Sequence, residues 1–181
     1  MNLRLLISRA IHGKPIEQVA EICGTEYQPY YNLMYLLAKQ INKGLLVELG
    51  VHKGRGVGCL AAAGNDNLVI GLDTNVPPEL ADVLNKFHNI LFLQKSSMPV
   101  PIDINRPISL LHIDTEHSYS MAKAEFEAYK PYLAKGAFVL FDDLHAQEDD
   151  VLRYFNELDY RVKIQDDRLH PTCGYGVMIY E

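Results

Sequence analysis

The sequence predicts an α/β fold: a doubly wound, mostly parallel sheet of seven strands, with helices at the N-terminus and an antiparallel hairpin at the C-terminus. From residue 45 onward, short apolar runs alternate with helical patterns, which is typical of such sheets. Several runs are continuously apolar, as expected of parallel strands that are buried on both faces. The runs are residues 45–49, 68–72, 90–93, 108–113, 137–141, 160–164 and 176–180.

Residues 1–44 are predicted to form a helical cap on the domain of residues 45–181, within one structural unit. One apolar helical stripe is made by residues that recur at steps of three and four: Tyr30, Leu33, Met34, Leu37 and Ile41. Four tyrosines lie in the same region, at positions 27, 30, 31 and 35. We favour a packed or dimerising face for them, which leaves a homodimer open. The alternative is an aromatic lid over a substrate.

Helical patterns lie between most of the later runs, at residues 78–87, 118–133 and 147–158. The last two runs are joined by residues 165–175, which have no helical pattern. We therefore expect these two runs to form a hairpin at the end of the sheet. His170, Cys173 and Tyr175 belong to this connection. We expect them on the surface, and the alternative is that they border the acceptor pocket.

Length and composition indicate an ordinary globular domain with one sizeable core, because 48% of the 181 residues are hydrophobic. The 17 Lys and Arg against 23 Asp and Glu give a net charge of −6, which argues against nucleic acid as a partner. No stretch approaches the ~20 apolar residues that span a bilayer, and Leu5–Ile7 is too short for a signal peptide. Three widely spaced cysteines, Cys23, Cys59 and Cys173, do not suggest disulfides, so a cytoplasmic location is expected.

The turn after the first run is rich in glycine, with Gly50, Gly54, Gly56 and Gly58 inside nine residues. Such a turn lets the backbone approach a ligand and opens a helix whose amide groups face it. The alternative is a tight turn that needs glycine for packing alone. Asp73 ends the second run, where a carboxylate can accept both hydroxyls of a ribose or simply cap a helix. Together, the turn and the acid indicate an adenosine-containing ligand.

Glu48 discriminates between adenosine ligands. Its carboxylate, at the end of the first run, would repel a pyrophosphate lying on the turn and attract an ammonium group. At ~4 Å and an effective dielectric constant near 20, such a contact amounts to roughly 4 kcal/mol before desolvation. S-adenosylmethionine has an adenosine and an ammonium group but no phosphate. The pattern therefore favours this ligand over a dinucleotide such as NAD, and the sequence after Gly50 is not that of a P-loop.

Acidic residues end two further runs: Asp114 follows the fourth, and Asp142 with Asp143 follows the fifth. If these strands are neighbours, ~4.8 Å apart, the carboxylates converge, repel one another and raise at least one pKa. A hard divalent cation such as Mg²⁺ or Ca²⁺ would relieve this repulsion. The alternatives are that Asp114 is an ordinary acid at a strand end and that Asp143 caps the next helix.

Glu48-Leu49-Gly50, followed by Gly54 and Gly56, resembles the first motif of the class I S-adenosylmethionine-dependent methyltransferases. The spacing is similar to the variant in metal-dependent O-methyltransferases of the catechol, caffeoyl-CoA and macrocin kind and in cephalosporin-hydroxylase-like proteins. The resemblance covers residues 45–181 and implies a Rossmann-like methyltransferase fold. It also implies S-adenosylmethionine as cofactor, and a small-molecule acceptor.

The resemblance implies that Glu48 and the turn Gly50–Gly56 hold the methionine end of the donor and that Asp73 holds the ribose. Ser97 falls where the family contacts the adenine or its ribose. Lys53 and Arg55, with His52, either face the donor carboxylate or are solvated. The candidate cofactor-binding residues are Glu48, Gly50, His52, Gly54, Gly56, Asp73, Ser97 and Asp114.

The resemblance further implies that Asp114, Asp142 and Asp143 hold Mg²⁺ or another divalent cation. Such an ion binds the acceptor hydroxyl, lowers its pKa and fixes its oxygen in line with the donor methyl. In catechol-type enzymes a lysine three residues beyond the strand-four aspartate is the base, and here that position is His117. An imidazole with a pKa near 6.5 accepts a proton at neutral pH, and His145 is the second candidate for this role.

The predicted function is therefore Mg²⁺-assisted O-methylation of a small molecule by S-adenosylmethionine. Ala134-Lys135-Gly136 replaces the Pro-Gly-Gly that is usual before strand five, which leaves the subgroup open. The alternatives are a member without a metal requirement, a non-catalytic protein that binds an adenosine cofactor, and an NAD-dependent oxidoreductase. The sequence does not identify the acceptor.

Overall fold

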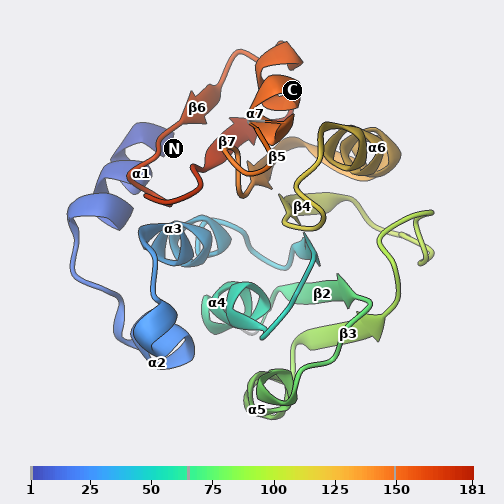
Figure 1. The fold of residues 1–181 in the computed structure, drawn as a ribbon. Helices are drawn as coiled ribbons and strands as arrows, with labels where there is room; N and C mark the ends of the chain where they lie inside the picture. The colour runs from blue at the N-terminus through green and yellow to red at the C-terminus, as the bar shows by residue number, and fades with distance from the viewer. Residues whose placement is uncertain (1, 65, 149) are drawn as a thin grey trace.

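A computed structural model describes residues 2–64, 66–148 and 150–181 and contains one sheet with helices on both faces (Figure 1). The sheet order is β3-β2-β1-β4-β5-β7-β6; β7 pairs antiparallel with both β5 and β6, and the other described pairs are parallel. The strands are β1 (Leu45–Leu49), β2 (Leu68–Asp73), β3 (Ile90–Gln94), β4 (Ile108–Ile113), β5 (Leu133–Phe141), β6 (Lys163–Gln165) and β7 (Gly176–Ile179). The predicted doubly wound sheet and its C-terminal hairpin are confirmed.

Helices cover both faces of the sheet. The N-terminal helices are α1 (Leu3–His12), α2 (Glu17–Cys23), the 3₁₀ turn η1 (Gly24–Glu26) and α3 (Pro29–Ala38). The later helices are α4 (Arg55–Ala62), α5 (Pro78–Lys86), α6 (Tyr119–Tyr129), the 3₁₀ turn η2 (Lys130–Tyr132) and α7 (Asp150–Glu157). Residues of α1, α3, α4 and α5 pack on one face, and residues of α6 and α7 pack on the other.

β1 shows how the sheet divides the core. All five of its residues are buried, as predicted for a strand covered on both faces. Leu46 joins the core under α3 and α4, whereas Val47 and Leu49 join the core under α6 and α7. Because side chains alternate along a strand, Glu48 lies on the same face as Leu46. Glu48, one residue before the end of β1, therefore lies beneath α3 and α4.

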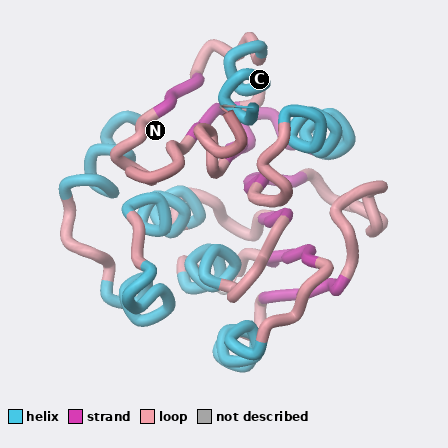
Figure 2. Tube along the Cα trace, viewed as in Figure 1, coloured by secondary structure: helices cyan, strands magenta, loops and turns pink. Residues whose placement is uncertain are grey.

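The connection from β3 to β4, residues 95–107, contains neither helix nor strand (Figure 2). In the part of the chain that the structure describes, no helix has both the length and the apolar character that are needed to cross a membrane.

The expectation that His170 and Tyr175 lie on the surface is wrong, although Asp167, Arg168, Pro171 and Thr172 of the same loop are exposed. The side chain of Tyr175 is fully buried and that of His170 is 14% exposed, although Cys173 is only partly buried. Tyr30 of α3 covers the loop: its ring stacks on Tyr175 with centroids 4.8 Å apart and lies 5.1 Å from that of His170. Its amide also donates to the carbonyl of Leu169. The burial comes from contacts with the N-terminal helices, so local periodicity gave no sign of it.

The side chain of Asn67 ties the end of α3 to the sheet. Asn67 is 3% exposed, and its Oδ1 accepts a hydrogen bond of 2.8 Å from the amide of Gly44, just before β1. Its Nδ2 donates to the carbonyls of Ala38 and Ile41 at 3.2 and 3.1 Å. One side chain therefore satisfies three backbone groups at this junction.

We expect Asn67→Ala to lower the free energy of unfolding by about 2–4 kcal/mol, because buried backbone groups would lose their partners. Urea unfolding of the full chain measures this. Gln40→Ala is the matched control: its side chain is exposed and makes one 3.4 Å hydrogen bond to Leu36, so a change within about 0.5 kcal/mol is expected. Equal losses in the two variants would contradict the role assigned to Asn67.

Candidate active site

A cavity of about 600 Å³ lies where the carboxyl ends of β1 to β5 meet. Open α/β sheets bind ligands at this edge, at the point where the strand order reverses, here between β1 and β4. The N-terminal segment adds Glu26, Tyr30 and Tyr31 to the wall, and the loop before β7 adds His170. The predicted site residues in the wall are Glu48, Gly50, His52, Gly56, Asp73, Ser97, Asp114, His117, Asp142 and Asp143.

The glycine turn is packed tightly against the strand ends. Gly50 has φ +84°, and a Cβ there would overlap the carbonyl oxygen of Asp114. A Cβ at Gly56 would overlap the carboxylate of Glu48. Gly54 has φ +83° and stands outside the cavity lining, directly before α4. Packing thus accounts for part of the glycine content, as the alternative interpretation held, and the turn also forms one wall of the cavity.

Glu48 and His112 form a buried ion pair under this turn. Their side chains are 2% and 1% exposed, and His112 Nδ1 donates to Glu48 Oε1 at 2.8 Å. Burial raises the pKa of Glu48, against the hydrogen bond from His112. Burial alone would lower the pKa of His112, but the hydrogen bond and the charge of Glu48 raise it to about 9. At neutral pH the pair therefore keeps its proton and has no net charge.

This pairing changes the electrostatic argument drawn from the sequence. A neutral pair repels a pyrophosphate less than a lone carboxylate does, so Glu48 discriminates between adenosine ligands less sharply than predicted. The carboxylate nevertheless lines the cavity, and its Oε2 receives no hydrogen bond from any described residue. A buried acceptor of this kind calls for a donor, and an ammonium group would provide one.

The carboxylate of Asp73 is shared between the turn and the cavity. Its Oδ2 accepts from the amides of Val51 and His52 at 2.9 and 2.7 Å, and its Oδ1 accepts from the amide of Asn75 at 2.8 Å. Asp73 therefore holds the backbone of the turn, and it does not cap a helix, because neither α4 nor α5 has a side-chain cap. Because a carboxylate has about four acceptor positions, it also keeps capacity for a ribose hydroxyl.

Two cations of the turn are paired inside the chain. Lys53 Nζ and Arg55 both lie 2.9 Å from Glu26 Oε1 of η1. Both side chains also line the cavity, which is compatible with the expectation that they face the donor carboxylate. The side chain of His52 is exposed at the rim of the cavity.

Ser97 is hydrogen-bonded to a buried acidic residue, Glu125, which the sequence did not single out. Ser97 is 8% exposed, and its Oγ donates to Glu125 Oε1 at 2.5 Å, while Thr115 donates to Glu125 Oε2 at 2.8 Å. Burial raises the pKa of the Glu125 carboxyl in spite of these two donors. The available signal was a charged residue on the apolar stripe of α6.

The acidic residues at the ends of β4 and β5 are organised by two histidines. His117 Nε2 lies 3.2 Å from Asp114 Oδ1 and 3.1 Å from Asp143 Oδ2. Asp142 is 3% exposed, and its Oδ1 accepts from His170 Nδ1 and from the amide of Asp143, both at 2.8 Å. The predicted set of three carboxylates is thus divided, with Asp114 and Asp143 facing His117 and Asp142 facing His170.

The charges of this cluster shift three pKa values. Burial and then the charge of Asp142 raise the pKa of Asp114. The hydrogen bond to Asp114 and the charge of Asp143 raise the pKa of His117, although burial opposes them. Burial alone would lower the pKa of His170, but its hydrogen bond to Asp142 raises it. The cluster therefore favours a positive charge in its centre, whether a proton or a cation.

The two histidines predicted as bases lie in different environments. His117 lines the cavity. His145 is not among the residues that line it, and its Nε2 lies 3.1 Å from Asp167 and 3.3 Å from Gln165. Of these two histidines, His117 is the one that lies beside both the acidic cluster and the cavity.

A protein-family model described as "Methyltransferase domain" matches residues 47–144, which is more than half of the chain. The match begins inside β1 and ends just after the acidic pair that follows β5. None of the curated proteins compared with this chain matches it.

Three solved structures illustrate the similarity of the fold. TomG, an O-methyltransferase of tomaymycin synthesis from Streptomyces achromogenes in complex with S-adenosylmethionine, has a TM-score of 0.68 at 14% identity over 100% of both chains. An O-methyltransferase from Bacillus cereus in complex with S-adenosylhomocysteine has a TM-score of 0.68 at 12% identity, covering 96% of this chain and 95% of its own. An rRNA methylase from Streptococcus thermophilus has a TM-score of 0.66 at 17% identity, covering 82% and 93%.

We expect Gly56→Ala to lower the free energy of unfolding by about 1–3 kcal/mol, because the new methyl group would push Glu48 away from His112. Chemical denaturation of the variant measures this. Gly64→Ala is the control, since a Cβ at Gly64 would meet no atom within 4 Å, and its stability should equal or slightly exceed that of the parent. An unchanged Gly56→Ala protein would show that the turn is looser than described.

Proposed function

Because the chain belongs to the methyltransferase domain family, whose model its residues 47–144 match, we propose that it transfers a methyl group from S-adenosylmethionine to a hydroxyl group of a small molecule. The observation that carries this proposal is the unsatisfied Oε2 of Glu48 in the wall of the cavity, beside the glycine turn. It supplies the acceptor that the ammonium group of the methionine end needs.

The residues at the strand ends suit the rest of the donor. Asp73 at the end of β2 has acceptor capacity left for a ribose hydroxyl, and Ser97 stands after β3 where the adenine would follow. The turn Gly50–Gly56 offers backbone without side chains next to Glu48. A dinucleotide is not favoured, because the matching family consists of methyltransferase domains.

The acceptor would lie on the other side of the cavity, between the N-terminal helices and the loop before β7. Tyr30, Tyr31 and Met121 give this part an apolar wall, and His170 adds a polar group. A cavity of about 600 Å³ has room for the donor and a small acceptor. The rRNA methylase with a similar fold does not decide the acceptor class. A net charge of −6 supports a small molecule over RNA.

In the proposed reaction the acceptor oxygen attacks the donor methyl carbon, the carbon–sulfur bond breaks, and S-adenosylhomocysteine leaves. In the absence of a bound ion, the proton of the acceptor hydroxyl passes to the imidazole ring of His117, whose Nε2 faces Asp114 and Asp143. The imidazolium that forms is stabilised by Asp114 at 3.2 Å and Asp143 at 3.1 Å. Two flanking carboxylates make this imidazole a stronger base than a free one, which agrees with the raised pKa of His117.

The donor set of Asp114, His117 and Asp143 also fits a divalent cation, because one ligand atom from each lies within 4.8 Å of the other two. When bound, such an ion would lower the pKa of the acceptor hydroxyl and neutralise the carboxylates, and His117 would then serve as a ligand instead of a base. Asp142 would act indirectly, since its Oδ1 already holds His170 and the amide of Asp143.

Isothermal titration calorimetry tests the cofactor. We expect the parent to bind S-adenosylhomocysteine but not NAD⁺. Glu48→Gln should weaken binding by about tenfold or more, because a charge-assisted hydrogen bond of about 1.5–3 kcal/mol is lost. Glu79→Gln, on the exposed face of α5, removes the same charge away from the cavity and should bind like the parent. Binding of NAD⁺ without S-adenosylhomocysteine would end the proposal.

Release of S-adenosylhomocysteine from the donor, across a panel of hydroxylated small molecules, tests catalysis. With an active acceptor, we expect His117→Gln to lower kcat by about 10²–10⁴-fold while S-adenosylhomocysteine still binds. The parent rate should rise with pH through a value above 6.5, because neutral His117 is the active form, and this rise should vanish in the variant.

The matched variant is His145→Gln, which should keep the parent rate and pH profile. If His145→Gln loses activity and His117→Gln does not, His145 is the base instead. Donor binding without turnover on any acceptor of the panel would favour the non-catalytic alternative.

A further inference from the structure

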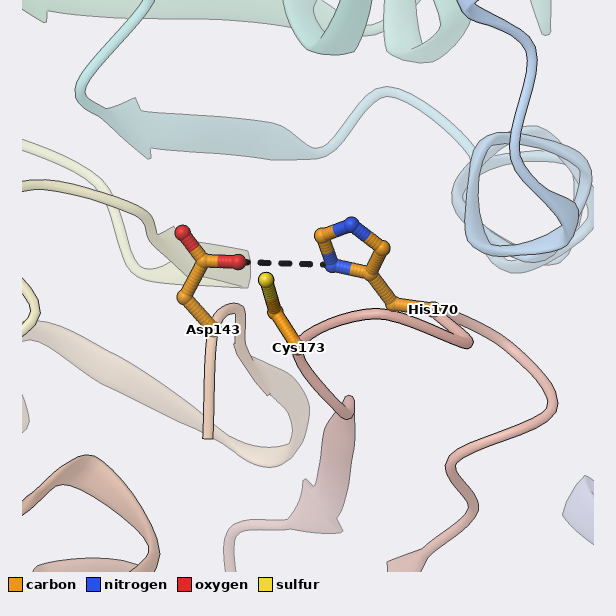
Figure 3. Close-up of side chains that lie close together, drawn as sticks. All are labelled: Asp143, His170 and Cys173. Atoms are coloured by element: carbon orange, nitrogen blue, oxygen red, sulfur yellow. Dashed lines mark ion pairs between the residues drawn. The ribbon is translucent and has the colours of Figure 1, made fainter. Parts of the chain in front are cut away.

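A second cluster of metal-ligating side chains adjoins the cavity on the side of the loop before β7. Asp143, His170 and Cys173 each offer one ligand atom, and these atoms all lie within 4.8 Å of one another (Figure 3). We propose that these three residues bind a divalent transition-metal ion of intermediate softness, for which Zn²⁺ is the representative. The proposal does not depend on methyl transfer.

The chemistry of the donors selects the ion. A thiolate, an imidazole and a carboxylate are the ligands that Zn²⁺ takes in proteins, whereas Mg²⁺ and Ca²⁺ take oxygen ligands. Cys173 thus distinguishes this cluster from the one formed by Asp114, His117 and Asp143. Three protein ligands leave the fourth position of a tetrahedron for water or another small ligand.

The backbone of the loop presents two of the ligands together. His170 and Cys173 are three residues apart in a tight turn, in which the amides of Cys173 and Gly174 donate to the carbonyl of His170 at 3.3 and 2.8 Å. Gly174 has φ +73°, and the next residue, Tyr175, is fully buried and anchors the turn. The amide of His145 donates to the carbonyl of Cys173 at 2.7 Å and fastens the turn to the segment after β5.

Asp143 supplies the third ligand from that segment. Its φ of +52° is unusual for a residue with a side chain, which indicates that its conformation is held by its surroundings. Its Oδ2 faces His117 at 3.1 Å, whereas its Oδ1 faces His170 at 3.4 Å. The two clusters therefore use different oxygens of one carboxylate, and an ion at the second cluster leaves Oδ2 available to the first.

The spacing fits a metal better than a hydrogen bond. With bonds of about 2.0–2.1 Å and a tetrahedral angle, zinc holds a nitrogen and an oxygen ligand roughly 3.4 Å apart. His170 Nδ1 and Asp143 Oδ1 are 3.4 Å apart. A side-chain hydrogen bond is usually shorter. Without an ion, His170 Nδ1 donates to Asp142 at 2.8 Å, and a bound ion would replace the proton of that hydrogen bond, which is released to solvent.

An unsatisfied atom provides independent support. Asp143 Oδ1 is shielded from solvent and accepts no hydrogen bond from a described residue, and its ion pair with His170 Nδ1 is long, at 3.4 Å. A buried carboxylate oxygen without a donor is costly, and a metal ion in contact with it would remove that cost. His170 Nδ1 and the thiol of Cys173 are the neighbouring groups that would complete its coordination.

Cobalt absorption spectroscopy tests the proposal without reference to activity. Chelator-treated full-length protein is titrated with Co²⁺, and a thiolate-to-cobalt charge-transfer band should appear in the near ultraviolet. Zn²⁺ should abolish the band by displacement, and an excess of Mg²⁺ should not. Cys173→Ser should remove the band, whereas Cys23→Ala should keep it, because Cys23 is buried against Cys59 away from the cluster.

Two histidine variants separate the clusters. His170→Gln should weaken Co²⁺ and Zn²⁺ binding by at least about tenfold, and His117→Gln should leave the band in place. The proposal is overturned if the folded parent gives no band, if the band survives Cys173→Ser, or if His117→Gln removes it while His170→Gln does not. Circular dichroism of each variant verifies that it is folded.

Discussion

The ion pair between Glu48 and His112 is the constraint on which the site depends. It joins the ends of β1 and β4, the two strands between which the sheet reverses its order. Removing one partner of such a buried pair costs about 3–5 kcal/mol, because the other charge is left uncompensated. The pair also occupies the space directly below Gly56, so it sets how closely α4 can approach the sheet. The floor of the cavity and the position of the turn are consequences of one contact.

The order of the strands then brings the other groups to the same edge. β4 lies between β1 and β5, so Asp114 at its end has Glu48 on one side and the acidic pair Asp142 and Asp143 on the other. So many carboxylates in one place require positive charge, and histidines provide it: His112 for Glu48, and His117 for Asp114 and Asp143. The same need explains why the cluster also suits a metal ion.

The fold was predictable because its signals are local. The strands β1 and β4 have the predicted boundaries, because a strand that is buried on both faces is a near-continuous run of apolar residues in the sequence. Strand-end acids such as Asp73 and Asp114 were found for the same reason. His112 and Glu125 were missed because their partners are distant: His112 pairs with Glu48 across 64 residues, and Glu125 meets Ser97 across 28. Sequence spacing also could not decide whether His117 or His145 is the base, because only the folded structure shows that His117 lines the cavity and His145 does not.

The ion pairs of Glu26 with Lys53 and Arg55 mean that a side chain of the protein competes with any anionic ligand for these two cations. Before any ligand arrives, a side chain from the N-terminal segment already occupies the two cations of the glycine turn. A carboxylate ligand would have to displace Glu26 from the two cations, so its net gain in electrostatic attraction would be small. A neutral molecule would not displace Glu26. Since Glu26 is about half exposed, releasing it costs little, and dissolved salt weakens its hold further. Only another anion can replace Glu26 beside Lys53 and Arg55 without a large loss of electrostatic attraction.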